Sequence, residues 1–144
     1  DFESGVIYPS NEWELRSFLV AKCFELMNQR KFDKPYQIGV EDVTIYGGDR
    51  ADLTLGNLEE LKTRCVTVEI KYFPTPNKII SDVKKLQKYK DKLTWAYFAA
   101  LGDISLKEKV DLITLGITKD EIEWRRVRSP YKERSKLSLI VKIR

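Results

Sequence analysis

The first regular pattern along the chain is helical. From Trp13 to Leu26, apolar side chains recur three or four residues apart, which is the spacing of an amphipathic helix. Ser10 precedes this pattern, and its side chain suits the N-cap position. We therefore predict a helix over residues 10–30, capped by Ser10.

The pattern changes to a period of two between residues 35 and 72. Apolar and polar residues alternate over 36–45, and the pair Gly47 and Gly48 gives a turn signal. A short strand at 51–55 is stopped by Gly56, and the clearest alternation of the chain lies at 65–72. Because these segments follow one another through polar connections, we predict an antiparallel meander of three strands.

The second half of the chain combines an amphipathic helix, an apolar strand and a terminal hairpin. The predicted ranges are 77–92 for the helix, 95–101 for the strand, 105–114 for a short further helix, and 121–128 and 136–143 for the hairpin strands. The apolar run that ends at Gly102 is typical of a fully buried central strand. This order predicts an α/β fold with a mixed central β-sheet flanked by helices. We expect a single domain over residues 1–144, with a core at 10–101 and a C-terminal helix and hairpin at 105–144.

The composition is that of a folded, soluble protein. Of the 144 residues, 42% are apolar and 33% are charged, which is far from the composition of disordered chains. No apolar run approaches the ~18 residues of a membrane helix, and residues 1–10 lack the basic start and apolar core of a signal peptide. Cys23 and Cys65 are isolated, and we predict buried thiols. We therefore expect no membrane partner and a cytoplasmic, or at least intracellular, location.

The sequence contains no histidine. This excludes Ser-His and Cys-His catalysis, histidine acid–base chemistry and a histidine-ligated zinc site. Any catalysis by this chain would depend on carboxylates and lysines, with or without a bound metal ion.

Two carboxylates and a lysine are predicted to converge in the meander. In the strand at 65–72, Glu69 and Lys71 point to the same face because side chains alternate. Asp52 interrupts an apolar strand, and pairing of the two strands would bring it next to Glu69. Carboxylate oxygens are hard ligands for Mg²⁺ or Mn²⁺, and a lysine beside them can orient an attacking water or help to deprotonate it. The three residues together favour phosphodiester hydrolysis, although a Glu-x-Lys strand taken alone is more often an exposed ion pair.

The arrangement resembles the PD-(D/E)XK, or restriction-endonuclease-like, nuclease superfamily. Its hallmark is an acidic residue at the start of one strand and Glu-x-Lys on the next, here Asp52 and then Glu69, Ile70 and Lys71. The similarity in the order of elements covers residues 10–101, and small nucleases such as archaeal Holliday-junction resolvases are closest in pattern. The resemblance implies a restriction-endonuclease-like fold, Mg²⁺ or Mn²⁺ held by Asp52, Glu69 and the Ile70 carbonyl, and activation of water by Lys71. Ala51 stands where the family name has proline, a departure that many divergent members share.

In many members of that family, a glutamate near the start of the first helix also reaches the site. Glu12, followed by Leu15 and Leu19 at helical spacing, resembles this pattern, and Glu14 is the competing candidate on another face. A glutamate at this position can also serve only to stabilise the positive end of the helix. We expect Glu12 in the catalytic set and leave that alternative open.

Basic residues are concentrated in two tracts. Residues 78–92 hold six lysines against two aspartates, and residues 121–144 hold eight lysines and arginines against three glutamates. A phosphate-binding surface and an ordinary solvated face would both produce such tracts. The residues we predict for nucleic-acid binding are Lys84, Lys85, Gln87, Lys88, Arg125, Arg126 and Arg128. Trp13, Trp95 and Trp124 are predicted to be core residues rather than platforms for base stacking.

We therefore expect a metal-dependent endonuclease that uses Mg²⁺ or Mn²⁺ and acts on DNA, with a homodimer expected only by analogy with the family. The alternative function is a catalytically inactive nucleic-acid-binding or assembly subunit with the same fold. A nuclease module of a larger defence or repair protein is a further alternative.

Overall fold

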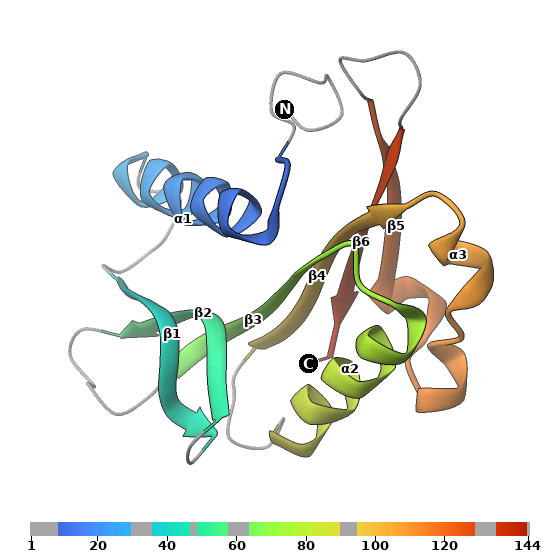
Figure 1. Ribbon diagram of the computed structural model, residues 1–144. Coiled ribbons are helices and arrows are strands. Elements are labelled where there is room, and N and C mark those ends of the chain that lie inside the picture. Colours follow the sequence, from blue (N-terminus) through green and yellow to red (C-terminus); the bar gives the residue numbers. More distant parts are fainter. Residues whose placement is uncertain are drawn as a thin grey trace.

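The computed structural model describes residues 9–29, 36–46, 49–57, 64–89, 95–128 and 135–143. Six strands form one mixed sheet in the order β1-β2-β3-β4-β6-β5, with α1 and α2 on opposite sides of it (Figure 1). The elements are α1 (Glu12–Asn28), β1 (Tyr36–Tyr46), β2 (Asp49–Asn57), β3 (Arg64–Tyr72), α2 (Pro76–Tyr89), β4 (Trp95–Asp103), α3 (Leu106–Lys109), η2 (Ile113–Leu115), η3 (Lys119–Glu121), β5 (Ile122–Val127) and β6 (Lys136–Lys142). The predicted mixed α/β sheet flanked by helices is confirmed.

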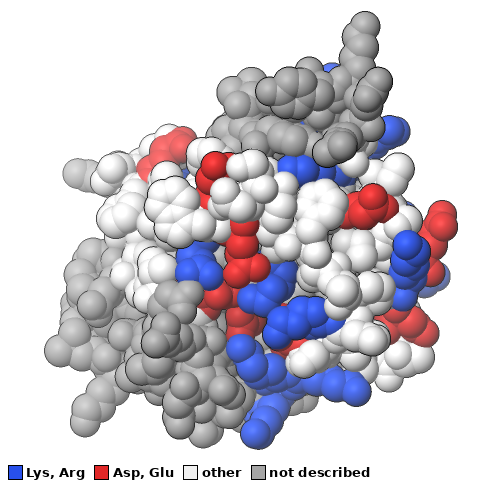
Figure 2. Space-filling view, in the orientation of Figure 1, with Lys and Arg blue, Asp and Glu red and all other residues white. Residues whose placement is uncertain are grey.

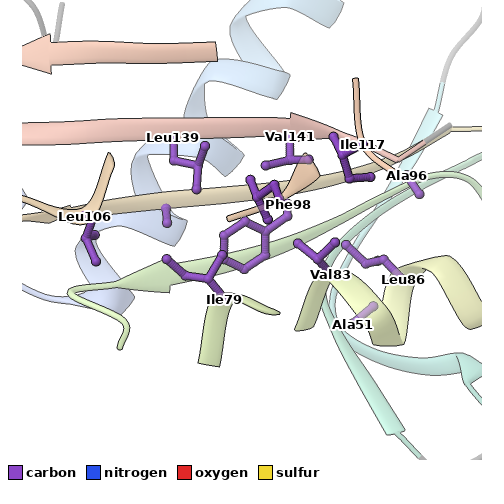
Figure 3. Packing of buried hydrophobic residues seen from close by; sticks show 12 residues of the cluster. Ala51, Ile79, Val83, Leu86, Ala96, Phe98, Leu106, Ile117, Leu139 and Val141 are labelled. Atoms are coloured by element: carbon purple, nitrogen blue, oxygen red, sulfur yellow. The ribbon is translucent and has the colours of Figure 1, made fainter. Parts of the chain in front are cut away.

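Two apolar clusters, one on each face of the sheet, fix the two long helices. On one face, Ile79 and Val83 of α2 pack against Phe98 of β4 (Figure 3). On the other face, Leu15 of α1 packs in a cluster with Ile70 of β3. Full burial of each large apolar side chain contributes roughly 1.5–3 kcal/mol. Both helices are therefore held firmly over the strands that carry the acidic residues.

The predicted meander is confirmed. β1 pairs with β2, and β2 pairs with β3, both in antiparallel register. β2 is longer than the predicted 51–55, because Gly56 stays in the ladder opposite Arg64. The register shifts between Leu55 and Gly56, and a glycine accommodates such an irregularity at low cost.

β4 lies in the middle of the sheet, as predicted, but it is not fully buried. It runs parallel to β3, with α2 as the crossover, and antiparallel to β6. Its side chains alternate in burial, and Trp95 at its start is 43% exposed. The strand also continues through Gly102 to Asp103, because the missing side chain at Gly102 leaves room for Leu106 to pack against the backbone.

The predicted cap of the first helix is wrong by one residue. Asn11 is the N-cap, and its side chain accepts a hydrogen bond of 2.9 Å from the Glu14 backbone N–H. Ser10 instead donates from its backbone N–H and its hydroxyl to the Glu14 carboxylate, at 2.7 and 2.8 Å. This reciprocal pattern satisfies donors that a helix start leaves open. The predicted end at residue 30 lies outside the described residues.

The predicted short helix at 105–114 is confirmed only over Leu106–Lys109, and its predicted length is wrong. α3 has only four residues, and the 3₁₀ turn η2 follows it. The Asp111 carboxylate accepts hydrogen bonds from the backbone N–H groups of Ile113 and Thr114, at 3.1 and 3.3 Å. Such local bonds compete with a continuous helix.

The terminal hairpin is confirmed, since β5 and β6 pair in antiparallel register. Residues 129–134, which join the two strands, lie outside the described residues. On β6, Leu139 and Val141 are buried in the core, as the alternation predicts.

The tryptophans and cysteines depart in part from the predicted core. Trp124 packs against the core, but Trp13 is 72% exposed because α1 uses Leu15 for its contact with the sheet. Cys23 is half-buried, and its burial raises the pKa of the thiol. The side chain of Cys65 lies outside the described part of the chain.

Within the described residues, no helix combines the length and the apolar character needed to span a membrane.

Candidate functional site

The site begins where β2 leaves β3. The ladder between these strands extends as far as Leu53 opposite Val68. At the next residue, Asp52, the carboxylate Oδ2 accepts a hydrogen bond of 2.7 Å from the Ile70 backbone N–H. Ala51 belongs to the cluster on the α2 side and Leu53 to the cluster on the α1 side, although alternate residues of a regular strand share a face. β2 therefore bends at Asp52, and the carboxylate fills the space between the strands.

Glu69 of β3 is the most deeply buried acidic residue of the site. Its side chain is 2% exposed, and Lys85 of α2 forms an ion pair with Oε1. That oxygen has no hydrogen bond of regular geometry, so its negative charge is offset by the ammonium of Lys85. A buried carboxylate requires such a partner, because desolvation of an unpaired charge is costly.

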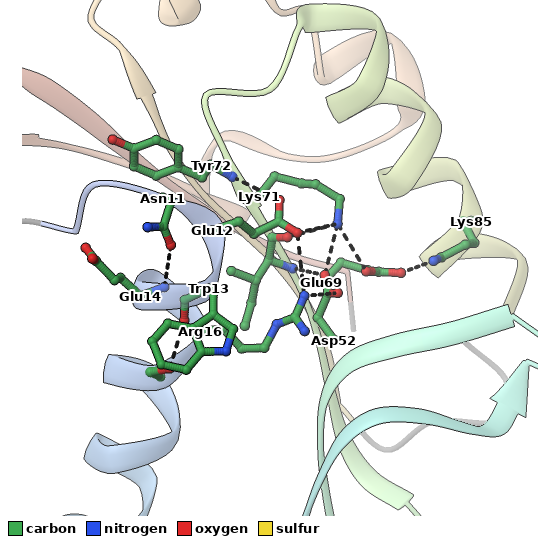
Figure 4. Close-up of polar contacts among 12 residues, drawn as sticks. Asn11, Glu12, Trp13, Glu14, Arg16, Asp52, Glu69, Lys71, Tyr72 and Lys85 are labelled. Atoms are coloured by element: carbon green, nitrogen blue, oxygen red, sulfur yellow. Dashed lines mark hydrogen bonds and ion pairs between the residues drawn. The ribbon is translucent and has the colours of Figure 1, made fainter.

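The Lys71 ammonium occupies the centre of the site (Figure 4). Nζ lies 3.0 Å from Asp52 Oδ2 and 2.9 Å from the Ile70 carbonyl oxygen. It lies 3.8 Å from Glu69 Oε2 and 3.9 Å from Glu12 Oε1. Four oxygen atoms from three elements thus converge on one positive charge.

Glu12 reaches this centre from the first turn of α1, whereas Glu14 does not. Glu12 Oε2 accepts a hydrogen bond of 3.4 Å from the Tyr72 backbone N–H. Glu14 is engaged with Ser10 at the helix start, and these hydrogen bonds hold the pKa of its carboxyl below the usual value. Of the two glutamates left open by the sequence, the structure brings Glu12 to the site.

Arg16 is a member of the site that the sequence did not indicate. Its Nη2 lies 3.1 Å from Asp52 Oδ1 and 3.5 Å from Glu12 Oε1. The available signal was its position four residues after Glu12, which places both on one face of α1. Three carboxylates (Glu12, Asp52, Glu69) are thereby balanced by three cations (Arg16, Lys71, Lys85).

The oxygen donors fit a divalent metal ion in their chemistry. Carboxylates and a backbone carbonyl are the hard ligands that Mg²⁺ and Mn²⁺ prefer. As placed, no three carboxylate, thiol or imidazole side chains among the described residues form a metal cluster. The predicted ligands Asp52, Glu69 and Ile70 instead direct oxygen atoms at the Lys71 ammonium. A divalent ion and this ammonium would therefore compete for the same oxygens.

The residues predicted for nucleic-acid binding on α2 separate into three environments. Lys84 and Lys88 are exposed, as a phosphate-contacting face requires. Lys85 turns to Glu69 and belongs to the site. The Gln87 amide donates a hydrogen bond of 2.8 Å to the Leu115 carbonyl, so Gln87 supports η2 rather than the carboxylates.

The three arginines of the C-terminal hairpin do not form one surface. Arg125 and Arg126 are consecutive on the edge strand β5, so their side chains point to opposite faces. Arg125 forms an ion pair with Glu123, Arg126 donates to the Ser135 hydroxyl at 3.2 Å, and Arg128 is exposed just after the strand. On the face shown in Figure 2, lysine and arginine side chains lie beside and below a central group of acidic ones. The basic residues that contact the carboxylates of the site are Arg16 of α1, Lys71 of β3 and Lys85 of α2, and none of them belongs to the hairpin.

In comparisons with known proteins, no family model matches this chain, and neither a curated protein nor a solved structure does so.

Proposed function

We propose that this protein is a metal-dependent nuclease that hydrolyses phosphodiester bonds of DNA. The observation that carries the proposal is the convergence of Asp52, Glu69, Glu12 and the Ile70 carbonyl on one cation position. The order of an acidic helix start, a meander, a crossover helix and a parallel strand supports a restriction-endonuclease-like fold. Together with the sequence motif, this order and this convergence support the proposal that the chain is similar to PD-(D/E)XK nucleases.

The proposed roles follow from the donor atoms. Asp52, Glu69 and the Ile70 carbonyl would hold Mg²⁺ or Mn²⁺, which when bound supplies charge neutralisation at the phosphoryl group and a more acidic water. Lys71 would leave these oxygens and orient the attacking water, since an ammonium is a donor of three hydrogen bonds. Glu12 is placed to receive the displaced ammonium. Arg16 and Lys85 act as positioning residues, because each holds one carboxylate of the set.

A second candidate function is a nucleic-acid-binding or assembly subunit without turnover. The observation that favours it is the complete pairing of the carboxylates with cations from the chain itself. A site balanced in this way is stable without metal, because each carboxylate already has a counter-charge.

A panel of substrates tests the proposal. Linear, nicked, branched and single-stranded DNA, with RNA as a further substrate, are incubated in Mg²⁺, in Mn²⁺ and in EDTA. We expect metal-dependent cleavage of at least one substrate by the wild-type protein and none by Asp52→Asn. Binding without cleavage in every condition would support the second candidate, and absence of any binding would contradict both.

A further inference from the structure

An aromatic groove lies between α1 and β1. Trp13 and Phe24 of α1 are 72% and 52% exposed, and Val40 of β1, on the opposite wall, is 47% exposed. Trp13 and Phe24 are eleven residues apart, close to three helical turns, so both project from the same face of α1. The groove has a volume of about 370 Å³, and Arg16 also lines it.

The aromatic groove opens directly beside the candidate site. Arg16 lines the groove and at the same time contacts Asp52 at 3.1 Å (Figure 4). Trp13 is the neighbour of Glu12 in the chain, and Val40 pairs with Leu53, the neighbour of Asp52. A strand whose phosphate lies at the carboxylates would therefore continue into the groove.

The exposed aromatic side chains are not needed for the core. α1 already packs against the sheet through Leu15, with Leu19 and Cys23 beside it. A surface that combines large aromatic side chains with an arginine matches the chemistry of nucleobases, which stack on aromatic rings and on guanidinium groups. Binding of phosphate groups alone would require only the positive charge of Arg16 and would not explain the two exposed aromatic rings.

The spacing of the two rings favours unpaired bases. Eleven residues of helix correspond to roughly 16 Å along the axis, whereas neighbouring bases of a duplex strand are only about 3.4 Å apart. In a duplex, moreover, the face of each base is covered by its neighbours, and a base must leave the stack before a protein ring can reach that face. Trp13 and Phe24 therefore suit two bases of a strand that is open and extended.

We propose that the aromatic groove binds the unpaired bases that flank the scissile phosphate, so that the substrate is single-stranded nucleic acid or an unpaired segment of a larger one. This inference rests on the proposed nuclease function and names the class of substrate for that site. Trp13 and Phe24 are the specificity-determining residues, and Arg16 joins the groove to the carboxylates.

Equilibrium binding in EDTA tests the inference without cleavage. A fluorescently labelled thymidine oligonucleotide, a duplex of equal length and an oligonucleotide carrying abasic sites are titrated with the protein and followed by anisotropy. Trp13→Ala and Phe24→Ala should each weaken binding of the single strand by about 5-fold to 100-fold, with little change for the duplex. Trp13→Phe should retain most of the affinity, because a ring remains available for stacking.

Phe18→Ala is the matched control, since Phe18 is a half-exposed aromatic residue of α1 that does not line the groove. It should leave strand binding unchanged, and circular dichroism verifies that each variant is folded. For the wild-type protein, removal of the bases should weaken binding as much as removal of the rings does.

Equal affinity of the thymidine and abasic oligonucleotides would overturn the inference, as would unchanged strand binding in both groove variants. A change of oligomeric state in Trp13→Ala with unchanged strand binding would assign the groove to a contact between copies, and would overturn it too. Cleavage of single-stranded DNA by both groove variants at the wild-type rate would leave the proposed function standing without this inference. Absence of all nucleic-acid binding would remove the proposed function itself.

Discussion

Each carboxylate of the site is balanced by a cation from a different part of the fold. Arg16 comes from α1, Lys71 from β3 and Lys85 from α2. Carboxylates so close together repel one another when ionised, and this repulsion must be offset by nearby positive charge. The cluster thus depends on three elements at once, and a single substitution changes the charge balance of all its members.

The two glutamates at the start of α1 should respond differently to neutralisation. Glu12→Gln should lower cleavage about 10-fold or more, because Glu12 Oε1 faces Lys71 in the site. Glu14→Gln should lower the midpoint of thermal unfolding and leave cleavage nearly unchanged, since Glu14 serves the helix start. Steady-state cleavage and thermal denaturation of both variants provide the comparison.

The effect of Glu14 on stability should also depend on pH. Its folded pKa is lowered by hydrogen bonds from Ser10, so its contribution to stability is present above the unfolded pKa and is lost as the pH falls through the folded pKa.

Equal and mild effects of Glu12→Gln and Glu14→Gln on cleavage would show that Glu12 only stabilises the start of the helix.

Lys136 gives the fold a second pH dependence, in the alkaline range. This lysine of β6 is 5% exposed, and its Nζ donates to the Pro9 carbonyl at 2.6 Å and to the Tyr72 hydroxyl at 2.7 Å. Burial lowers its pKa below the usual 10.5, while attraction to Glu14 partly opposes that shift. Near the folded pKa, the unfolded chain therefore binds more protons at this position than the folded protein does.

Stability of the wild-type protein relative to Lys136→Met should accordingly rise as the pH increases from the folded pKa of Lys136 toward 10.5. A neutral amine still has two N–H groups for Pro9 and Tyr72, so both hydrogen bonds can persist. Urea denaturation of the two proteins at several alkaline pH values measures the difference, in which the shared titrating groups cancel. A difference that falls with pH over this range would show that the ammonium is the better-stabilised form.

At the scale of elements, α2 offers the basic face that best suits a nucleic-acid backbone. Lys84 and Lys88 are exposed on it, while Lys85 points inward to Glu69. Replacing Lys84 and Lys88 together by alanine should reduce the slope of log affinity against log salt by about 0.7–0.9 for each phosphate that is no longer neutralised. The exposed pair Lys107 and Lys109 of α3, replaced in the same way, is the matched control. Affinity that does not change between low and moderate salt would contradict a phosphate-contacting face.

The sequence predicted correctly those elements whose own residues show a regular pattern of buried and exposed positions. The alternation of the meander and the pairing of β5 with β6 both follow from one-sided burial. Errors occurred where another group intervenes. Asp111 divides the predicted helix at 105–114 through hydrogen bonds to Ile113 and Thr114, and Gly102 continues β4 because Leu106 occupies the adjacent space.

The residues of the candidate site were also predicted only in part. Asp52, Glu69 and Lys71 followed from strand alternation, and Glu12 followed from the family pattern. Arg16 and the inward direction of Lys85 did not follow, because they depend on how α1 and α2 lie over β3. Trp13 was predicted to be a core residue but is exposed. α1 has apolar residues on both faces, and the sequence does not show which face meets the sheet.

At the scale of the whole molecule, the site lies where three structural units meet. β2 bends away from β3 at Asp52, α1 covers one face of the sheet there, and α2 covers the other (Figure 1). The separate apolar clusters on the two faces hold the helices without using the carboxylates. The acidic residues can therefore be substituted without removing the contacts that fix the fold, and we expect such variants to remain folded.

Calorimetric titration with Mn²⁺, run beside a cleavage assay, measures metal binding and catalysis separately for each residue of the site. Asp52→Asn and Glu69→Gln should lose both metal binding and cleavage. Lys71→Ala should lose cleavage by about 100-fold or more but bind Mn²⁺ at least as tightly as the wild-type protein, because its ammonium lies 3.0 Å from Asp52 Oδ2 and competes for the metal's oxygens. The losses should be non-additive when combined, since the three residues act as one unit. Wild-type Mn²⁺ affinity in Asp52→Asn, loss of Mn²⁺ binding in Lys71→Ala, or cleavage that persists in EDTA would show that these residues do not form a metal-dependent catalytic site.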